Sequence, residues 1–247
     1  RVLGRSRLKR ELDTLRLSLQ DANTDVRVAG QRAIVEILDS IDNPQASVPA
    51  LLRQKLVELA ESGSGDVQVR LIAQVILLRL HDQRFEPAIA QVMQSADEKL
   101  RRLLVEVLPR RHPILVTALG DSAESVRTFA AHRLAESGDK RAVPVLQALL
   151  KGRGSQVLLA YMDLRRLGVR VEEPPQLSAL LRTRDLALRF AAVQTLRYLS
   201  PKEAVRYLMQ LAYDPADVVR KEVVRCAAEL FRRERLPVLR LVLERFL

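Results

Sequence analysis

Basic and aromatic residues gather in the C-terminal part of this chain in a pattern that could bind a ligand. Residues 151–247 contain 19 Lys and Arg against 11 Asp and Glu, and seven of the nine aromatic residues lie beyond residue 160. Basic side chains attract phosphate or carboxylate, while aromatic rings stack on bases, pack on peptide side chains or hold cations. The candidate ligand-binding or partner-binding residues are Tyr161, Arg165, Phe190, Gln194, Arg197, Tyr198, Lys221 and Arg225.

Patterns for catalysis and metal binding are weak. The three histidines His81, His112 and His132 are isolated and form no HxxxH or HExxH spacing. The sequence contains neither a GxSxG motif nor a glycine-rich phosphate loop after a strand. Cys226 is the only cysteine, which excludes an intramolecular disulfide and a zinc site of several cysteines. We therefore expect no enzymatic activity, no catalytic residues, no metal and no cofactor.

A repeated sequence frame positions the candidate residues. Six arginines each follow an apolar residue, and six residues before each arginine stands a residue type common at helix N-caps. The intervals between these arginines are 43, 31, 26, 62 and 31 residues, and a period near 31 indicates a stacked repeat. The frame arginines are Arg27, Arg70, Arg101, Arg127, Arg189 and Arg220. The predicted caps are Asp21, Ser64, Ser95, Asp121, Thr183 and Asp214.

Each frame predicts a pair of amphipathic helices. Small or apolar residues follow the arginine at positions +3, +6 and +7, as in Gly30, Ala33 and Ile34, and make one buried stripe. The 62-residue interval contains a degenerate repeat with Gly154 at the cap and Ala160 in the arginine position. The shorter helices that precede the frame helices are predicted at 8–19, 48–60, 86–93, 113–119, 142–150, 176–181 and 201–212, and a closing helix at 236–246.

Two segments carry a family resemblance. Residues 121–134 (DSAESVRTFAAHRL) and 183–196 (TRDLALRFAAVQTL) resemble HEAT repeats, in the short bacterial variety of HEAT-like and phycobilin-lyase-like proteins. The resemblance implies an all-α fold, a right-handed α-solenoid of about seven HEAT-like helix pairs plus the closing helix, as a single domain over 1–247. In this family the frame arginine bonds acidic or carbonyl groups of the adjoining turn, so the six arginines are expected to form a structural ladder. The second helices are expected to line a concave face, where the candidate binding residues would share one exposed stripe.

Charge divides the expected domain into three parts. Residues 1–20 are a basic lead-in with the first helix, 21–150 are near neutral, and 151–247 are the basic, aromatic-containing half. The opening RVLGRSRLKR has five basic residues and no acidic one, which suits either a solvated lead-in or the cytoplasmic face of a membrane. No apolar run reaches 18 residues. The expected location is cytoplasmic, with attachment to a membrane through a preceding segment as a further possibility.

The sequence is most typical of a non-catalytic scaffold or adaptor whose concave surface docks a protein partner with an acidic segment. The alternative is a nucleic-acid-binding HEAT-like protein with a shape resembling DNA glycosylases, although the Trp that such enzymes use is absent. A phycobilin-lyase-like subunit is a third reading that rests on the repeat type alone. An importin-like asparagine ladder is disfavoured, because Asn23 and Asn43 are the only asparagines. The sequence does not indicate an oligomeric state.

Overall fold

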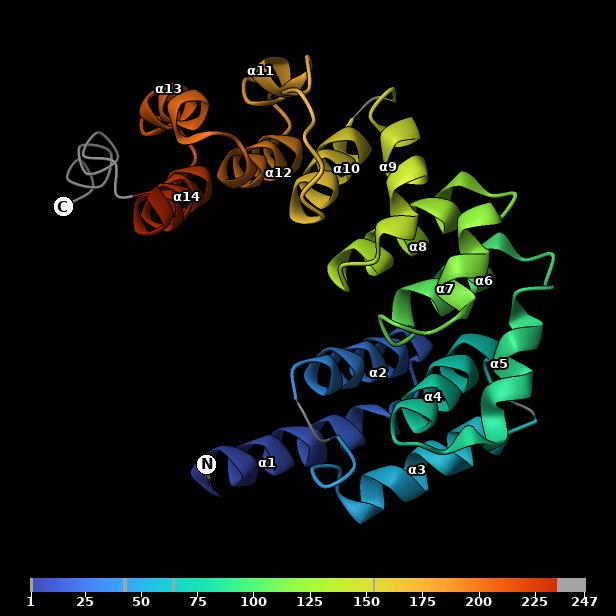
Figure 1. Ribbon diagram of the computed structural model, residues 1–247. Helices are drawn as coiled ribbons and strands as arrows, with labels where there is room; N and C mark the ends of the chain where they lie inside the picture. The colour runs from blue at the N-terminus through green and yellow to red at the C-terminus, as the bar shows by residue number, and fades with distance from the viewer. Residues whose placement is uncertain (1, 42–43, 64, 153, 235–247) are drawn as a thin grey trace. The chain divides into compact units, whose positions relative to one another are not determined.

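The computed structural model describes residues 2–41, 44–63, 65–152 and 154–234 (Figure 1). The described residues form α-helices and short 3-10 turns but no strand, which confirms the prediction of an all-α helical-repeat fold. The helices are α1 (Val2–Ser18), α2 (Thr24–Asp39), α3 (Ala50–Glu61), α4 (Val67–Arg79), α5 (Glu86–Val92), α6 (Glu98–Val107), α7 (Ile114–Thr117), α8 (Glu124–Glu136), α9 (Val143–Leu149), α10 (Ser155–Arg166), α11 (Leu177–Leu180), α12 (Leu186–Thr195), α13 (Pro201–Leu211) and α14 (Asp217–Glu234). Short 3-10 turns lie at Gln83–Phe85, Ala118–Gly120, Lys140–Ala142 and Leu196–Tyr198.

These helices form the seven predicted pairs, in which each even-numbered helix is a frame helix. The chain divides into two compact units, Arg1–Arg133 and Leu134–Leu247. The predicted closing helix at 236–246 and the predicted cap Ser64 lie outside the described residues. The single domain over 1–247 stays a prediction.

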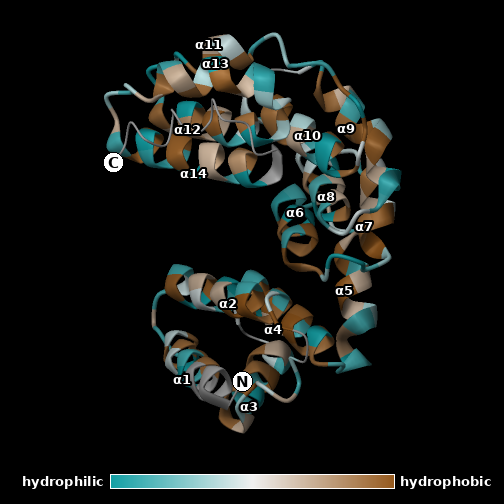
Figure 2. Cartoon of the chain, turned by 60° about the vertical axis from the view of Figure 1, so that its left-hand side comes forward, coloured by the Kyte–Doolittle hydropathy of each residue, from teal (hydrophilic) through white to brown (hydrophobic). Residues whose placement is uncertain are grey.

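Both units are built by the same packing rule. In the first unit α4 packs against α2, α3 and α6, and in the second α12 packs against α10, α11 and α14. Figure 1 shows α10, α12 and α14 in a row, with α11 and α13 on one side of it. Each helix carries hydrophobic and hydrophilic residues around its circumference (Figure 2), and the hydrophobic ones fill the space between neighbours.

The helix caps lie two residues later than predicted. Four of the frame helices are capped by side chains of Asn23, Asp66, Asp97 and Asp185, each four residues before the frame arginine. The predicted cap residues instead close the turn before the helix. Asp121, for example, accepts from the backbone N–H of Ala123 at 2.8 Å. A short side chain with an acceptor oxygen can either cap a helix or close the turn before it, so residue type alone does not distinguish the two roles.

The capping box of Ser200 and Glu203 is present at the start of α13. Pro215 lies in the turn before α14, which begins at Asp217.

The fifth pair has a different register from the one predicted. Gly154 is the N-cap of α10, as expected. Because the other caps stand four residues before the frame arginine, the arginine position here is Leu158 rather than Ala160. Leu158 also lies 31 residues after Arg127 and 31 before Arg189, so the period holds through the degenerate repeat.

The corrected register explains the position of Tyr161. It falls at +3 of the frame, a position that Ala130 and Ala192 fill in other repeats, and its side chain is only 2% exposed. Tyr161 packs in the core of the second unit with Leu158 and Leu177. The expectation that Tyr161 lies on a binding surface is therefore wrong.

We predict that the +3 position tolerates little extra volume. Ala192 is fully buried, so Ala192→Leu should lower the free energy of unfolding by about 1–3 kcal/mol through overpacking. The matched control is Ala187→Leu on the exposed side of the same helix, which should change stability by less than about 0.5 kcal/mol. Urea denaturation followed by circular dichroism measures both, and equal stability of the two variants would contradict the assigned register.

Candidate functional site

The frame arginines close the turns from which their own helices start. In each, the guanidinium Nη1 donates to a backbone carbonyl of the preceding turn at 2.5 to 3.1 Å. In five of the six the acceptor is the residue six positions earlier, such as Asp121 for Arg127. Carbonyls in a helix-start turn are not bonded within the helix, so an arginine that folds back satisfies them.

Two of these arginines also reach the next repeat. Arg101 donates from Nε and Nη2 to the carboxylate of Asp121, both at 2.9 Å. Arg189 pairs with Asp214, with Nε 2.9 Å from Oδ2. All four side chains are almost fully buried. The two-pronged pair of Arg101 and Asp121 fixes orientation as well as distance, whereas Arg189 donates to Asp214 through Nη2 alone, at 3.3 Å. Each pair joins two consecutive repeats.

Within the described part of the chain, these pairs form only where the next turn supplies an aspartate. Ser95 occupies that position after Arg70 and cannot offer a carboxylate. At the fifth pair both ladder residues are replaced, with Leu158 in the arginine position and Gly152 in the aspartate position. The division between the two compact units falls just before this repeat.

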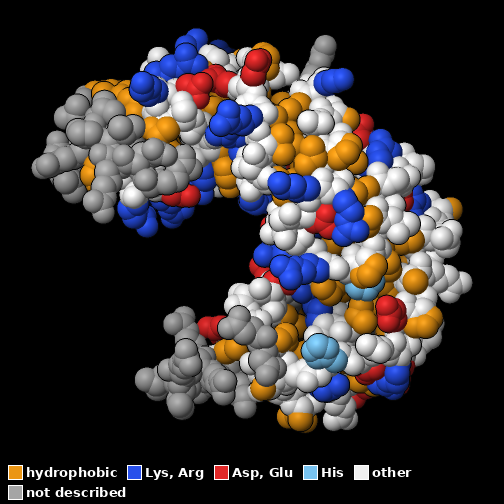
Figure 3. Space-filling view, viewed as in Figure 1, with side chains coloured by type: hydrophobic (Ala, Val, Ile, Leu, Met, Phe, Trp, Pro, Cys, Tyr) orange, Lys and Arg blue, Asp and Glu red, His pale blue; other side chains and the backbone are white. Residues whose placement is uncertain are grey.

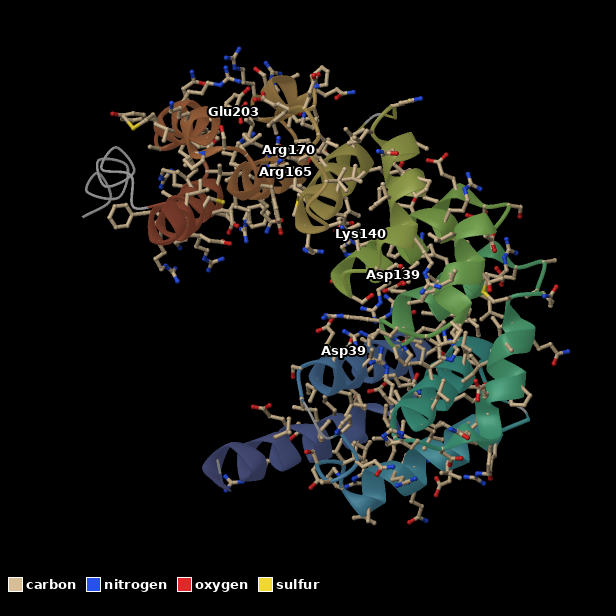
Figure 4. The ribbon with its side chains drawn as sticks, in the orientation of Figure 1. Asp39, Asp139, Lys140, Arg165, Arg170 and Glu203 are labelled. Atoms are coloured by element: carbon tan, nitrogen blue, oxygen red, sulfur yellow. The ribbon has the colours of Figure 1, made fainter. Side chains whose placement is uncertain are left out.

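A second group of arginines, missed by the sequence analysis, caps helix C-termini. Arg79 donates to the carbonyl of Val107 at 2.7 Å, and Arg133 to that of Leu108 at 2.6 Å, so the two together cap the end of α6. Both also pair with the carboxylate of Asp39, which Figure 4 shows on α2. A cation near the last carbonyls of a helix is favourable. These arginines occupy different frame positions, so no repeat signal marks them.

Arg165, a predicted binding residue, belongs to this second group. Its Nε donates to the carbonyl of Tyr198 at 3.0 Å, at the end of the turn that follows α12. Figure 4 shows Arg165 on α10, where α10 lies beside α12. Arg166 reaches the Tyr198 hydroxyl at 3.4 Å. Arg165 and Tyr198 thus hold α10 and α12 together.

Three predicted binding residues meet in one surface depression of about 650 Å³ between α12 and α14. We call it the α12–α14 groove. Basic side chains are visible over α14 in the space-filling view (Figure 3). The groove is lined by Gln194, Arg197, Glu222, Val224, Arg225, Ala228, Glu229 and Arg232.

A buried carboxylate organises the groove. Glu222 is only 2% exposed and pairs with both Arg197 and Arg225. Arg197 is held further by Glu229 at 3.4 Å. Beneath it, burial raises the pKa of the Cys226 thiol to about 11, so this cysteine is a core residue and not a nucleophile at neutral pH. The Arg225 side chain is 75% exposed, so its head group can still contact a ligand.

The remaining predicted residues lie near the groove but do not line it. Phe190 is half-buried on α12, one turn before Gln194. Lys221 is exposed on α14, one turn before Arg225, and pairs with Asp217 at 2.7 Å. The predicted stripe of eight residues therefore separates into three that line the groove, two that lie near it, two that join α10 to α12, and one core residue.

Comparison with protein families supports the repeat assignment. Residues 85–161 match the family of HEAT repeats. The prediction of HEAT repeats is confirmed for this segment. No match was found among curated proteins.

Three solved structures illustrate the range of similar proteins. The Escherichia coli protein YibA has 16% identity and a TM-score of 0.45, covering 89% of this chain and 92% of its own. An engineered protein has 19% identity and a TM-score of 0.42, covering 89% and 68%. Human deoxyhypusine hydroxylase in complex with glycerol has 16% identity and a TM-score of 0.38, covering 94% and 100%.

Two further properties bear on the site. Within the described residues no group of three or more His, Cys, Asp and Glu side chains is placed to hold a metal ion. Among the described helices none has the length and apolar character needed to cross a membrane.

We predict that the ladder arginines differ in their contribution to stability. Arg189→Ala should lower the free energy of unfolding by about 1–3 kcal/mol, because Asp214 is 5% exposed and would lose its charged donor. Arg27→Ala is the matched control, since its acceptor carbonyls at Asp21 and Ala22 lie in an exposed turn where water can replace the arginine. Thermal melts compare the variants, and an equal loss in both would contradict the assigned role of the cross-repeat pair.

We also predict an acid-dependent loss of stability from the same ladder. The hydrogen bond from Arg101 lowers the pKa of Asp121 below its usual value. A carboxyl whose pKa is depressed in the folded state stabilises it above the unfolded pKa of about 4, and this contribution is lost as the pH falls through the folded pKa. Asp121→Asn should therefore reduce the dependence of unfolding free energy on pH below about 4. Arg101→Gln should reduce it by a smaller amount, because the backbone N–H of Ala123 and the charge of Arg127 still lower the pKa of Asp121, and an unchanged pH dependence in both variants would contradict the pairing.

Proposed function

We propose that this HEAT-repeat protein is a non-catalytic scaffold or adaptor whose α12–α14 groove binds an acidic segment of a protein partner. The observation that carries the proposal is that the groove arginines differ in how far their charges are paired and exposed. Arg197 is held in place by Glu222 and Glu229, whereas the Arg225 head group is mostly exposed. Arg232 is exposed and makes no ion pair within the described part of the chain. A fixed groove with two accessible cationic heads suits carboxylates of a short segment.

The same groove suits a peptide better than a nucleic acid. Two of its five ionisable side chains are carboxylates, Glu222 and Glu229. A phosphate backbone is bound by a row of cations that neutralise several phosphates, and carboxylates among them repel it. Val224 and Ala228 add apolar contact area between the charges. Nucleic-acid binding remains the alternative, because the segment 151–247 has an overall excess of basic residues.

The proposal includes a cytoplasmic location, at a membrane face where the basic segment RVLGRSRLKR meets anionic lipid headgroups. Support comes from the sequence of this segment. Cosedimentation with phosphatidylserine vesicles tests it, and equal binding to neutral vesicles would contradict it.

The groove proposal predicts a loss of binding on removal of its exposed cations. Arg225→Ser with Arg232→Ser should weaken the binding of a fluorescein-labelled oligoglutamate peptide by roughly two- to thirtyfold, since exposed ion pairs contribute about 0.2–1 kcal/mol each. Fluorescence anisotropy at increasing salt measures the affinity. The matched control is Arg53→Ser with Arg111→Ser, two exposed arginines of the first unit.

Two outcomes would overturn the proposal. If the parent protein does not bind the peptide even at low salt, an acidic partner is excluded. If it binds duplex DNA more tightly than the peptide, with an affinity that falls steeply with salt, the nucleic-acid alternative replaces it.

A further inference from the structure

A second depression in the same unit lies between the turns that precede α12 and α14. Its volume is about 400 Å³, within the range of small-ligand sites. Leu181, Tyr207 and Leu211 supply apolar walls, and Tyr213 and Pro215 line it from the turn before α14. We call it the turn pocket. It shares no lining residue with the α12–α14 groove.

The ladder makes the turn pocket rigid. Arg189 and Asp214 both line it, and their ion pair joins the turn before α12 to the turn before α14. Arg189 also donates to the carbonyl of Thr183, and Asp214 accepts from the backbone N–H of Ala216 at 2.8 Å. The walls are therefore held in place without a ligand, and little order would have to be gained on binding.

Exposed apolar side chains surround this edge of the unit. Tyr213 is 61% exposed, and Leu186 and Val218, near the N-terminal ends of α12 and α14, are also exposed. Among the described residues of the second unit these are the large hydrophobic side chains with the greatest exposure. Apolar residues grouped at one edge beside a depression mark an interaction surface more than isolated ones do.

The charge at the pocket mouth is available to a partner. Arg182 and Arg184 line the pocket and are exposed, and within the described part of the chain neither side chain makes a hydrogen bond or ion pair. This differs from the α12–α14 groove, where Glu222 already pairs with Arg197 and Arg225.

We propose that the turn pocket binds an acidic peptide segment that inserts one apolar side chain. The leucine-sized or phenylalanine-sized anchor would contact Leu181, Tyr207 and Leu211, while flanking carboxylates pair with Arg182 and Arg184. The walls of Leu181, Tyr207 and Leu211 match an apolar side chain rather than a phosphate, which favours a peptide over a polyanion. The site is independent of the proposed function of the groove.

The test uses three fluorescein-labelled probes and the full chain. The first is a peptide of one leucine flanked by glutamates, the second replaces leucine by serine, and the third is a single-stranded oligonucleotide. Fluorescence anisotropy should show the leucine peptide binding about tenfold more tightly than the serine peptide. Arg182→Glu with Arg184→Glu should weaken the binding of the leucine peptide by about tenfold or more.

Matched variants assign the site. Arg53→Glu with Arg111→Glu makes the same change of charge on exposed residues of the first unit and should leave the affinity unchanged. Tyr213→Ser should reduce the preference for leucine over serine. Thermal melts of each variant should match the parent, because these side chains lie on the surface.

The results separate the two sites. If binding of the leucine peptide is lost only in the variant Arg225→Ser with Arg232→Ser, the proposal for the turn pocket is wrong and the proposal for the groove is supported. If the leucine and serine peptides bind equally, the apolar anchor is excluded. If the oligonucleotide binds more tightly than either peptide and loses affinity on Arg182→Glu with Arg184→Glu, the pocket recognises nucleic acid and the proposal fails.

Discussion

The structure depends on one recurring need, the satisfaction of backbone carbonyls in the turns that start the frame helices. A helix of this kind leaves polar groups at its ends without intrahelical partners, and burying them unpaired is costly. The frame arginine meets this need from within its own repeat, as Arg127 does for the carbonyls of Asp121 and Ser122. Where the following turn supplies an aspartate, the same guanidinium also joins the next repeat, as Arg189 does with Asp214. Local closure of a turn and stacking of repeats are thus performed by a single side chain.

Asp121 and Asp214 each take part both in closing a turn and in stacking one repeat on the next. The side-chain carboxylate of each aspartate accepts hydrogen bonds from an arginine of the preceding repeat and from a backbone N–H of its own turn. The backbone carbonyl of the same aspartate accepts a hydrogen bond from the frame arginine of its own repeat. The turn pocket follows from this arrangement, because the Arg189–Asp214 pair holds two consecutive turns apart at a fixed spacing with apolar side chains between them. A rigid depression is therefore a by-product of repeat stacking. Its use as a binding site would require only changes at exposed positions such as Arg182 and Arg184.

The helix pairs could be predicted from the sequence because the period and the apolar stripe are both properties of single segments. The exact caps could not, since Asp121 and Asp185 are alike in type but occupy the turn and the cap respectively. Tyr161 was misplaced because a frame without its arginine leaves the register to be chosen, and a shift of two residues moved a core residue to the surface. The pairing of Glu222 with Arg197 joins residues 25 positions apart on different helices. No local sequence pattern predicts such a contact, so the sequence could not show which arginines keep an unpaired charge for binding.

Pairing between arginines and carboxylates of neighbouring helices changes what a high net charge implies in a repeat protein. The basic excess of residues 151–247 first suggested a continuous cationic stripe. In the structure Arg165, Arg189 and Arg197 donate to carbonyls or carboxylates of neighbouring helices and turns, so their charges are largely used within the fold. Among the described residues, exposed arginines line the groove, as Arg225 and Arg232 do, and the turn pocket, as Arg182 and Arg184 do. Because an arginine paired in a buried site cannot also pair with a ligand without leaving a carboxylate unpaired, binding falls to arginines outside the ladder. Specificity would then come from the apolar shape beside those few charges rather than from the total charge.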